Sequence, residues 1–133
     1  MLKKITLLTF CCFKTTIELW KFTGENIDYY ETVDGRQPFR DWLFGLRDKA
    51  ARHKIDARIR RVESGNFEHC GPVGEGVLEL KINFGSGYRV YFGQVGNKIV
   101  ILLNGGDKSS KSKDIKIAHI YWADYRRRYG GEK

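Results

Sequence analysis

The clearest pattern in the chain is an alternation of apolar and polar residues between Val77 and Lys108. Apolar side chains occupy every second position in two stretches, residues 78–84 and 88–92, as expected for strands with one buried face. The next stretch, Lys98 to Leu103, is almost wholly apolar, which indicates a strand in the middle of a sheet. We therefore predict three consecutive strands joined by glycine-containing turns.

The length of the first turn predicts which side chains face each other. A three-residue loop at residues 85–87 sets Asn83 opposite Arg89 and Lys81 opposite Tyr91. A two-residue loop would instead turn the cation of Arg89 onto the apolar face. The glycines favour the longer loop, because such hairpins need a residue with positive φ.

The second turn extends the same polar face. A two-residue hairpin at Gly96-Asn97 sets Asn104 opposite Arg89, and Lys108 follows just beyond the strand end. We predict that this face binds anions and that it collects Lys81, Asn83, Arg89, Tyr91 and Asn104, with Lys108 beside them.

The remaining segments predict one more strand and three helices. Residues 25–34 suit a first strand, Pro38 opens a helix, and Asp48 caps a second helix that Gly65 stops. Residues 66–76 are interpreted as a loop, and a last helix is expected after Ser109-Ser110. The fold class is α+β, with an antiparallel-dominated sheet of about four strands, two N-terminal helices and one C-terminal helix. The apolar positions at helical spacing are Phe39, Trp42, Leu43 and Leu46, then Ala51, Ile55, Ile59 and Val62, and finally Ile115, Ala118, Trp122, Tyr125 and Tyr129.

Residues 1–20 stand apart from this pattern. Lys3, Lys4 and the apolar run from Ile5 to Phe13 resemble the start of an export signal, but no small-residue cleavage site follows. The run is too short to span a bilayer, so no membrane partner is expected. We interpret residues 1–20 as a poorly ordered leader or extension and residues 21–133 as a single domain.

The charge balance favours a polyanionic partner. The 133 residues carry a formal net charge of +8, which indicates nucleic acid first and an acidic protein second. Residues 47–61 hold seven Lys or Arg against two Asp, either as a solvated helix face or as a surface that follows phosphates. The arginines at 126–128 suit the negative end of a helix dipole.

The sequence contains no motif of a familiar enzyme class. A Walker loop, a dinucleotide fingerprint, a Ser-His-Asp arrangement and metal-ligand spacing are all missing from the sequence, so no cofactor is expected. His69 and Cys70 are adjacent, and neighbours rarely aim at each other as a nucleophile and base must. Three cysteines form no disulfide framework, which fits a reducing compartment, here the cytoplasm.

RNA cleavage suits the predicted polar face, because RNA supplies its own nucleophile, the 2′-hydroxyl. The protein then needs only to hold the phosphate in line and stabilise the added charge. Arg89 could clamp that charge through its planar fork. Lys81 and Lys108 could neutralise phosphates or transfer protons, and Tyr91 could stack on a base or act as an acid.

Three stretches resemble a known family. ELKINFGSGYRVYF (79–92), LLNGGDKSSKSKDIKIA (102–118) and YYETVDGRQPFRDWLFGL (29–46) are similar to the phage-derived killer-protein branch of the RelE/HigB toxin superfamily. The resemblance covers about residues 28–129. It implies a toxin of a type II toxin–antitoxin system, an addiction-module killer protein that cuts mRNA on the ribosome without metal and causes growth arrest. Its implied partners are mRNA, the ribosome and a cognate antitoxin of helix-turn-helix type.

The resemblance also assigns residues. Arg89 matches the phosphate-stabilising arginine of the superfamily, and Lys81 and Lys108 match its basic positions. Two departures are Glu79, where a second basic residue is expected, and residues 113–115, where a tyrosine or histidine often stands; His119 is a late candidate. The predicted catalytic residues are Arg89, Lys81, Lys108 and Tyr91, and the predicted RNA-binding residues are Asn83, Asn104, Lys111 and Lys113. The alternatives are a non-enzymatic nucleic-acid-binding module, or an inactive toxin that acts with a DNA-binding antitoxin, and a basic protein that docks on an acidic partner.

Overall fold

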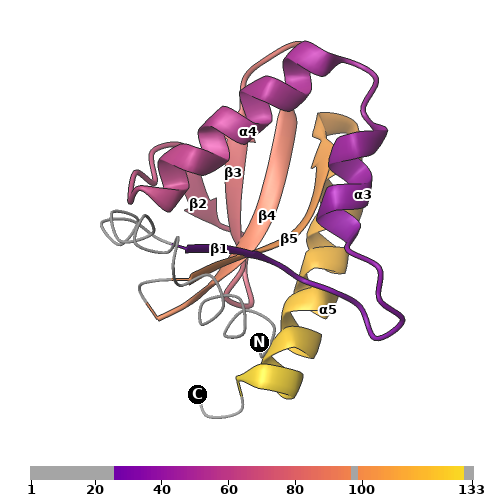
Figure 1. Cartoon of the computed structure of the whole chain (residues 1–133), viewed down its shortest axis with the longest axis vertical. Helices are drawn as coiled ribbons and strands as arrows, with labels where there is room; N and C mark the ends of the chain where they lie inside the picture. The colour runs from indigo at the N-terminus through magenta and orange to yellow at the C-terminus, as the bar shows by residue number, and fades with distance from the viewer. Residues whose placement is uncertain (1–25, 97–98, 131–133) are drawn as a thin grey trace, which may run out of the picture.

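The computed structural model describes residues 26–96 and 99–130. Within these residues the chain forms a five-stranded mixed sheet with the strand order β1-β5-β4-β3-β2, together with three α-helices (Figure 1). β1 runs parallel to β5, and the other neighbouring strands are antiparallel. The elements are β1 (Asn26–Tyr29), α3 (Pro38–Gly45), α4 (Lys49–Glu63), β2 (Cys70–Pro72), β3 (Leu78–Ile82), β4 (Tyr88–Val95), β5 (Ile99–Asp107), the 3₁₀ turn η3 (Lys108–Ser110) and α5 (Lys111–Tyr129).

The α+β class is confirmed, but two details of the prediction are wrong. The described sheet has five strands instead of about four, because part of the predicted loop at 66–76 forms β2 at the sheet edge. The two helices predicted as N-terminal elements lie between β1 and β2. β2 escaped prediction because Gly71 and Pro72 weaken a strand signal, although proline is tolerated on an edge strand. The predicted leader, residues 1–20, lies outside the described residues.

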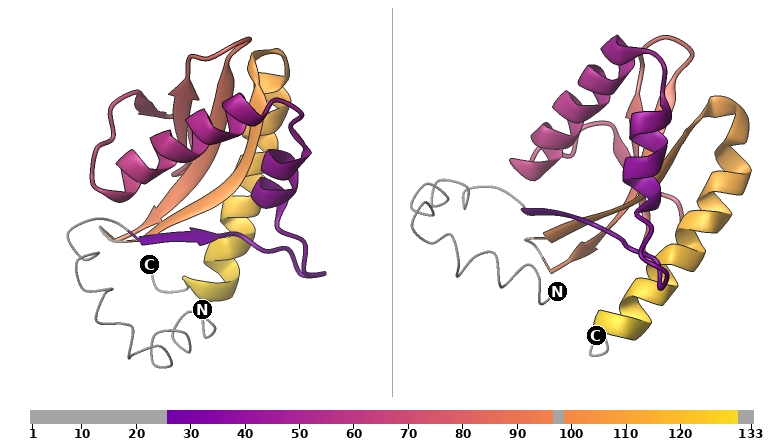
Figure 2. Two further views of the ribbon diagram at one scale, coloured as in Figure 1. Left: turned by 45° about the horizontal axis from the view of Figure 1, so that its top comes forward. Right: turned by 45° about the vertical axis from the view of Figure 1, so that its right-hand side comes forward.

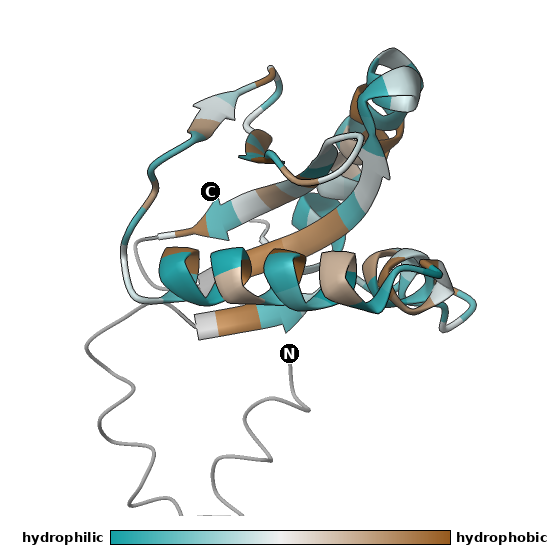
Figure 3. Cartoon of the chain, turned by 90° about the horizontal axis from the view of Figure 1, so that it is seen from above, coloured by the Kyte–Doolittle hydropathy of each residue, from teal (hydrophilic) through white to brown (hydrophobic). Residues whose placement is uncertain are grey.

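Helices cover both faces of the sheet, as the two views in Figure 2 show, with α3 and α4 on one side and α5 on the other. Figure 3 shows apolar residues along the strands between the helices and polar residues on the outer side of α4. One core, between the sheet and α3 and α4, contains Phe39, Ile55, Ile59, Val62, Leu80, Ile82, Val90, Phe92, Val100 and Leu102. The other core, between the sheet and α5, contains Tyr30, Val77, Tyr91, Ile101, Leu103, Ala118 and Trp122.

β5 lies between β1 and β4, which confirms the prediction that the apolar third strand is central. Its side chains enter both cores, since Val100 and Leu102 face α3 and α4 while Ile101 and Leu103 face α5. A strand buried on both faces must be apolar at successive positions, and this explains why β5 lacks the alternation of its neighbours.

The helix ends follow the sequence signals in most respects. The Asp48 carboxylate accepts hydrogen bonds from the backbone N–H groups of Ala50 (2.9 Å) and Ala51 (3.2 Å), as predicted for a helix cap. α5 begins after Ser110, but the Ser110 side chain makes no capping bond and its hydroxyl contacts Asp114 instead (2.5 Å). No helix within residues 26–96 and 99–130 is long and apolar enough to cross a membrane.

Two tryptophans lie directly on glycines of the sheet. A Cβ on Gly93 of β4 would come within 2.5 Å of the Trp122 ring on α5, and a Cβ on Gly105 of β5 would overlap the Trp42 ring on α3. Because neither glycine carries a side chain, each indole ring packs against the strand backbone. These contacts hold α3 and α5 close to opposite faces of the sheet.

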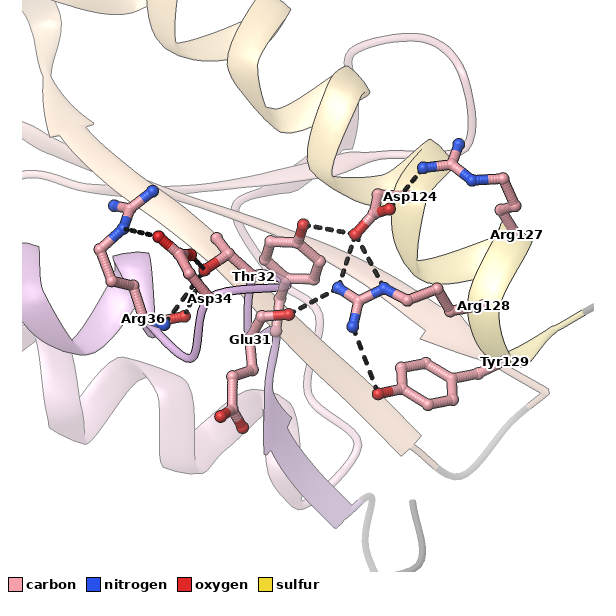
Figure 4. A network of polar contacts seen from close by, with 9 residues as sticks. Glu31, Thr32, Asp34, Arg36, Asp124, Arg127, Arg128 and Tyr129 are labelled. Carbon is pink, nitrogen blue, oxygen red and sulfur yellow. Dashed lines mark hydrogen bonds and ion pairs between the residues drawn. The ribbon is translucent and has the colours of Figure 1, made fainter.

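A polar network joins α5 to the segment after β1 (Figure 4). Asp124 accepts hydrogen bonds from the Tyr30 hydroxyl (2.7 Å) and from Arg128 (2.5 and 3.0 Å), and Arg128 also donates to the backbone carbonyl of Glu31 (2.6 Å). Arg128 first, and then the Tyr30 hydroxyl, hold the pKa of Asp124 below its usual value. Burial, followed by the hydrogen bond to Asp124, raises the pKa of Tyr30 to about 12. The arginine cluster therefore does more than meet the helix dipole.

This network predicts an acid-sensitive part of the fold. The pKa of Asp124 is lowered in the folded state, so its stabilisation is present above the ordinary carboxyl value of about 3.9 and is lost as the pH falls below it. We expect Asp124→Asn to lower the free energy of unfolding by roughly 1 kcal/mol at pH 7, since Arg127 and solvent reach the carboxylate. The difference from wild type should shrink at pH 3 in urea unfolding. An equal difference at both pH values would contradict the assignment.

Candidate functional site

The pairing of β3 with β4 differs from the predicted register. Lys81 lies opposite Arg89, and Glu79 lies opposite Tyr91, so the loop spans residues 83–87 instead of 85–87. The predicted pairs Asn83–Arg89 and Lys81–Tyr91 are therefore wrong. Both pairs shift by an even number of positions, so Lys81, Arg89 and Tyr91 still share one face, as predicted.

The pairing of β4 with β5 also differs. Asn104 lies opposite Tyr91 and Gly106 lies opposite Arg89. The predicted pair Asn104–Arg89 is wrong for two reasons: three residues instead of two separate the paired Val95 and Ile99, and the register shifts by one more position between Tyr91 and Phe92. A bulge of this kind adds a residue to one strand, and no turn length can reveal it. Gly106 has no side chain, so β5 places none beside Arg89.

Four of the eight predicted site residues come together at one pocket. Lys81, Asn83, Arg89 and Lys108 line a pocket of about 630 Å³ beside the β3–β4 loop, and His69 joins them from the segment before β2. The other lining residues are Ile82, Phe84, Gly85, Ser86, Gly87 and Tyr88. The wall is thus rich in cations and backbone groups, which suits an anionic ligand.

The loop glycines bring Lys108 to this pocket. Gly87 has a φ of +94°, and the aliphatic stem of Lys108 passes 3.5 to 3.7 Å from where its Cβ would be. A side chain at Gly87 would be in ordinary van der Waals contact with this stem, but the positive φ would strain the loop. The ammonium group of Lys108 is thereby carried from the start of η3 toward the strands that hold Lys81 and Arg89.

Arg89 is held by a buried carboxylate. Its Nη1 donates to Glu79 Oε2 at 2.9 Å, and Lys111 Nζ lies 4.0 Å from the same oxygen. The residue Glu79 is only 4% exposed, while the Arg89 side chain is 15% exposed. A buried carboxylate needs such a partner, because leaving it unpaired would be costly. Glu79 stands where the family resemblance implies a second basic residue, and here its carboxylate orients the Arg89 guanidinium.

The other predicted residues do not line the pocket. Tyr91 is fully buried, and Asn104 is 6% exposed beneath α5, where its Nδ2 donates to the backbone carbonyl of Asp114 (3.2 Å). Lys111 faces Glu79, and Lys113 is exposed on α5. The predicted anion-binding face collected Lys81, Asn83, Arg89, Tyr91 and Asn104, but α5 covers the part that contains Tyr91 and Asn104, so these two side chains are not open to a ligand.

Burial raises the pKa of Tyr91, with the nearby Glu79 and Asp114 carboxylates adding to the effect, so its phenol stays neutral. We expect Tyr91→Phe to leave any activity of the pocket within about twofold of wild type. The Tyr91 hydroxyl has no hydrogen-bond partner among the described residues, so its loss should cost little stability. Initial rates and thermal unfolding of the purified variant test this. If Tyr91→Phe lost activity while its stability was unchanged, Tyr91 would have a role in the reaction.

His69 is the pocket residue that sequence reasoning missed. The sequence drew attention to His69 only as a neighbour of Cys70, and burial raises the pKa of the Cys70 thiol to about 11, which disfavours a thiolate. The pairing of β2 with β3 places His69 beside Lys81, whose backbone N–H donates to the His69 carbonyl (3.1 Å). Only a correct prediction of β2 could have revealed this. The late candidate His119 instead lies against Val73, with its Nε2 3.0 Å from that carbonyl.

The chemistry of the pocket is that of charge stabilisation. Arginine and lysine bind phosphate oxygens, and Arg89 keeps N–H donors beyond the one that its Nη1 gives to Glu79. Among residues 26–96 and 99–130, no group of three or more His, Cys, Asp or Glu is placed to hold a metal ion.

Comparison with known proteins identifies the family. Residues 41–128 match the sequence profile of the phage-derived Gp49-like proteins (DUF891). The chain belongs to this family. Gp49-like proteins are associated with toxin–antitoxin modules, where they are addiction-module killer proteins. The matched residues include the whole pocket wall, from His69 to Lys108.

A relative from Haemophilus influenzae (strain ATCC 51907 / DSM 11121 / KW20 / Rd) is 48% identical over 82 residues. These residues make up 62% of this chain and 83% of the relative, whose name is "Uncharacterized protein". The family match covers residues 41–128, and the association of this family with toxin–antitoxin modules gives the chain an expected antitoxin partner.

Proposed function

We propose that this Gp49-like protein is the toxin of a type II toxin–antitoxin system and that it cleaves mRNA as an endoribonuclease. The observation that carries the proposal is the convergence of Arg89, Lys81 and Lys108 on one pocket. Arg89 would stabilise the charge that develops on the phosphoryl oxygens, while Lys81 and Lys108 bind the phosphates of the RNA chain. The resemblance of residues 79–92 and 102–118 to the killer-protein branch of the RelE/HigB toxins would imply the same reaction.

The proposed reaction needs no metal. The 2′-hydroxyl attacks the adjacent phosphorus, and the product ends are a 2′,3′-cyclic phosphate and a 5′-hydroxyl. The enzyme contributes position and electrostatic stabilisation, which can supply most of the rate enhancement in such reactions. We propose the ribosome-bound message as substrate, the cytoplasm as the place of action, and a helix-turn-helix antitoxin as the neutralising partner.

The test is induced expression in bacteria, followed by mapping of new mRNA ends. We expect ends within translated frames that require kinase treatment before ligation, because a 5′-hydroxyl cannot be ligated directly. Ends that carry a 5′-phosphate would point to metal-assisted hydrolysis instead. Growth arrest without new mRNA ends would contradict the proposal.

The ion pair between Arg89 and Glu79 supports a second candidate, a toxin-like module that binds nucleic acid without cutting it. A paired arginine contributes less charge to a phosphate site. Such a module would bind nucleic acid with a steep salt dependence and leave RNA intact at every protein concentration. Cleavage by the purified wild-type protein would exclude it.

A further inference from the structure

His69 has an unusual backbone conformation at the pocket wall. Its φ is +70°, a value that few residues other than glycine adopt, although histidine is among the more tolerant. The hydrogen bond from the Lys81 N–H to the His69 carbonyl extends the β2–β3 ladder through this residue. Such conformations persist only where the surrounding structure holds them, and they cluster at functional sites.

His69 directly before β2, Lys81 on β3 and Arg89 on β4 lie side by side in the structure. Lys81 is hydrogen-bonded to His69 on one side and paired with Arg89 on the other. Neighbouring strands lie about 4.8 Å apart, so the three backbones span roughly 10 Å. All three residues line the same pocket. The row therefore has an arginine at one end and a histidine at the other, with a lysine between them.

The pocket offers few groups that could remove a proton. Tyr91 is fully buried and does not line the wall, and Lys81 and Lys108 are exposed, which suits ammonium ions that bind phosphate. An imidazole changes its charge between about pH 5 and pH 8, so it can take a proton at neutral pH. The His69 side chain is 48% exposed and therefore accessible to a bound nucleic acid.

We propose that His69 is the general base that activates the 2′-hydroxyl, an inference that rests on the proposed ribonuclease function. The imidazole takes the proton of the 2′-hydroxyl as the 2′-oxygen forms its bond to phosphorus. The bond from phosphorus to the 5′-oxygen breaks, and that oxygen receives a proton from solvent. His69 later returns its proton to water, so the enzyme ends unchanged.

The charged groups that face the imidazole come from several elements. Glu68 Oε2 lies 3.7 Å from His69 Nε2, where its negative charge stabilises the imidazolium that forms when the base takes a proton. The cations of the wall are Lys81 on β3, Arg89 on β4 and Lys108 after β5. Glu68 is largely exposed, so its effect should weaken as salt is added.

The test uses two substitutions that keep the backbone conformation. Asparagine and glycine both tolerate positive φ, so His69→Asn and His69→Gly should fold as the wild type does. Single-turnover cleavage of ribosome-bound mRNA is measured from pH 5.5 to pH 8.5. We expect both variants to be about 10² to 10⁴ times slower and to lose the rise in rate with pH that the wild type shows. Added imidazole should restore part of the His69→Gly rate, because the site is open to solvent.

The matched control is His53→Asn, on the exposed face of α4 and outside the pocket wall, which should keep both the wild-type rate and the pH profile. His69→Asn with wild-type rate and profile, beside an inactive Arg89→Ala, would overturn the role of His69 alone. A wild-type protein that cuts no RNA would overturn the ribonuclease function as well.

A second substrate distinguishes a general base from a general acid as the role of His69. When sulfur replaces the bridging 5′-oxygen, the leaving group departs without a proton, so only a defect in a general acid is relieved. We expect the defect of His69→Asn to persist on this substrate. A return to the wild-type rate would overturn the assignment of His69 as the base.

Discussion

Arg89→Ala should reduce RNA cleavage by about 10² to 10³, the loss that follows removal of one preorganised donor to a developing oxyanion. The arginine is held by Glu79 at 2.9 Å and lines the pocket, so its fork is positioned before any substrate arrives. Arg89→Lys keeps the charge but loses the fork, and an intermediate loss is expected. Single-turnover cleavage by the purified proteins gives the rates directly.

Arg89→Ala also leaves a buried carboxylate without its nearest partner. Breaking a buried pair typically costs about 3 to 5 kcal/mol, so lost folding must be separated from lost chemistry. The double variant Arg89→Ala/Glu79→Gln removes both charges and should recover stability but not cleavage. Arg60→Ala, on the exposed face of α4, makes the same change in net charge and should cut RNA as the wild type does. A folded Arg89→Ala protein with the wild-type rate would remove Arg89 from the reaction.

Gly93→Ala should be strongly destabilising for so conservative a substitution. The added Cβ would lie 2.5 to 2.6 Å from three atoms of the Trp122 ring, and this ring is stacked on Tyr125 at a centroid distance of 5.4 Å. Overpacking of a well-packed core costs about 1 to 3 kcal/mol, and a stacked indole has little room to move. We expect a loss in the upper half of that range by urea unfolding.

The matched control is Gly71→Ala on the edge strand β2, where no heavy atom lies within 4 Å of the new Cβ. That substitution should change stability by less than about 0.5 kcal/mol. Gly93→Ala combined with Trp122→Phe should be less damaging than the sum of the two single changes, because the smaller ring makes room. Strict additivity would show that Trp122 is not the source of the strain.

The elements of the fold were predictable where one local pattern decided them. Pro38, Asp48 and the apolar spacing of α4 fix two helices without reference to the rest of the chain. The apolar run of β5 likewise indicated a central strand. β2 was missed because Gly71 and Pro72 give no strand signal of their own, and its pairing with β3 depends on a partner distant in sequence.

The candidate site was predictable only in part. The period-two alternation correctly placed Lys81 and Arg89 on one face. The turn between their strands is two residues longer than predicted, and a shift by two residues leaves each side chain on the same face of the sheet. The sequence pattern could not show that α5 covers Tyr91 and Asn104, because a polar residue on a strand is ordinarily interpreted as exposed. The apolar stripe of α5 needed a sheet face to pack on, and Ile101 and Leu103 supplied one.

The parallel pairing of β1 with β5 has a consequence for synthesis. The strand that begins at Asn26 pairs with residues 99–102, and Arg128 near the end of α5 holds the segment after β1. The N-terminal part of a chain is synthesised first, so β1 leaves the ribosome before the residues of β5 with which it pairs. Lys108 joins the pocket at about the same stage. The sheet of a growing polypeptide thus stays open at β1 until residues 99–102 have left the exit tunnel, and its pocket stays without one of its cations until Lys108 has followed them.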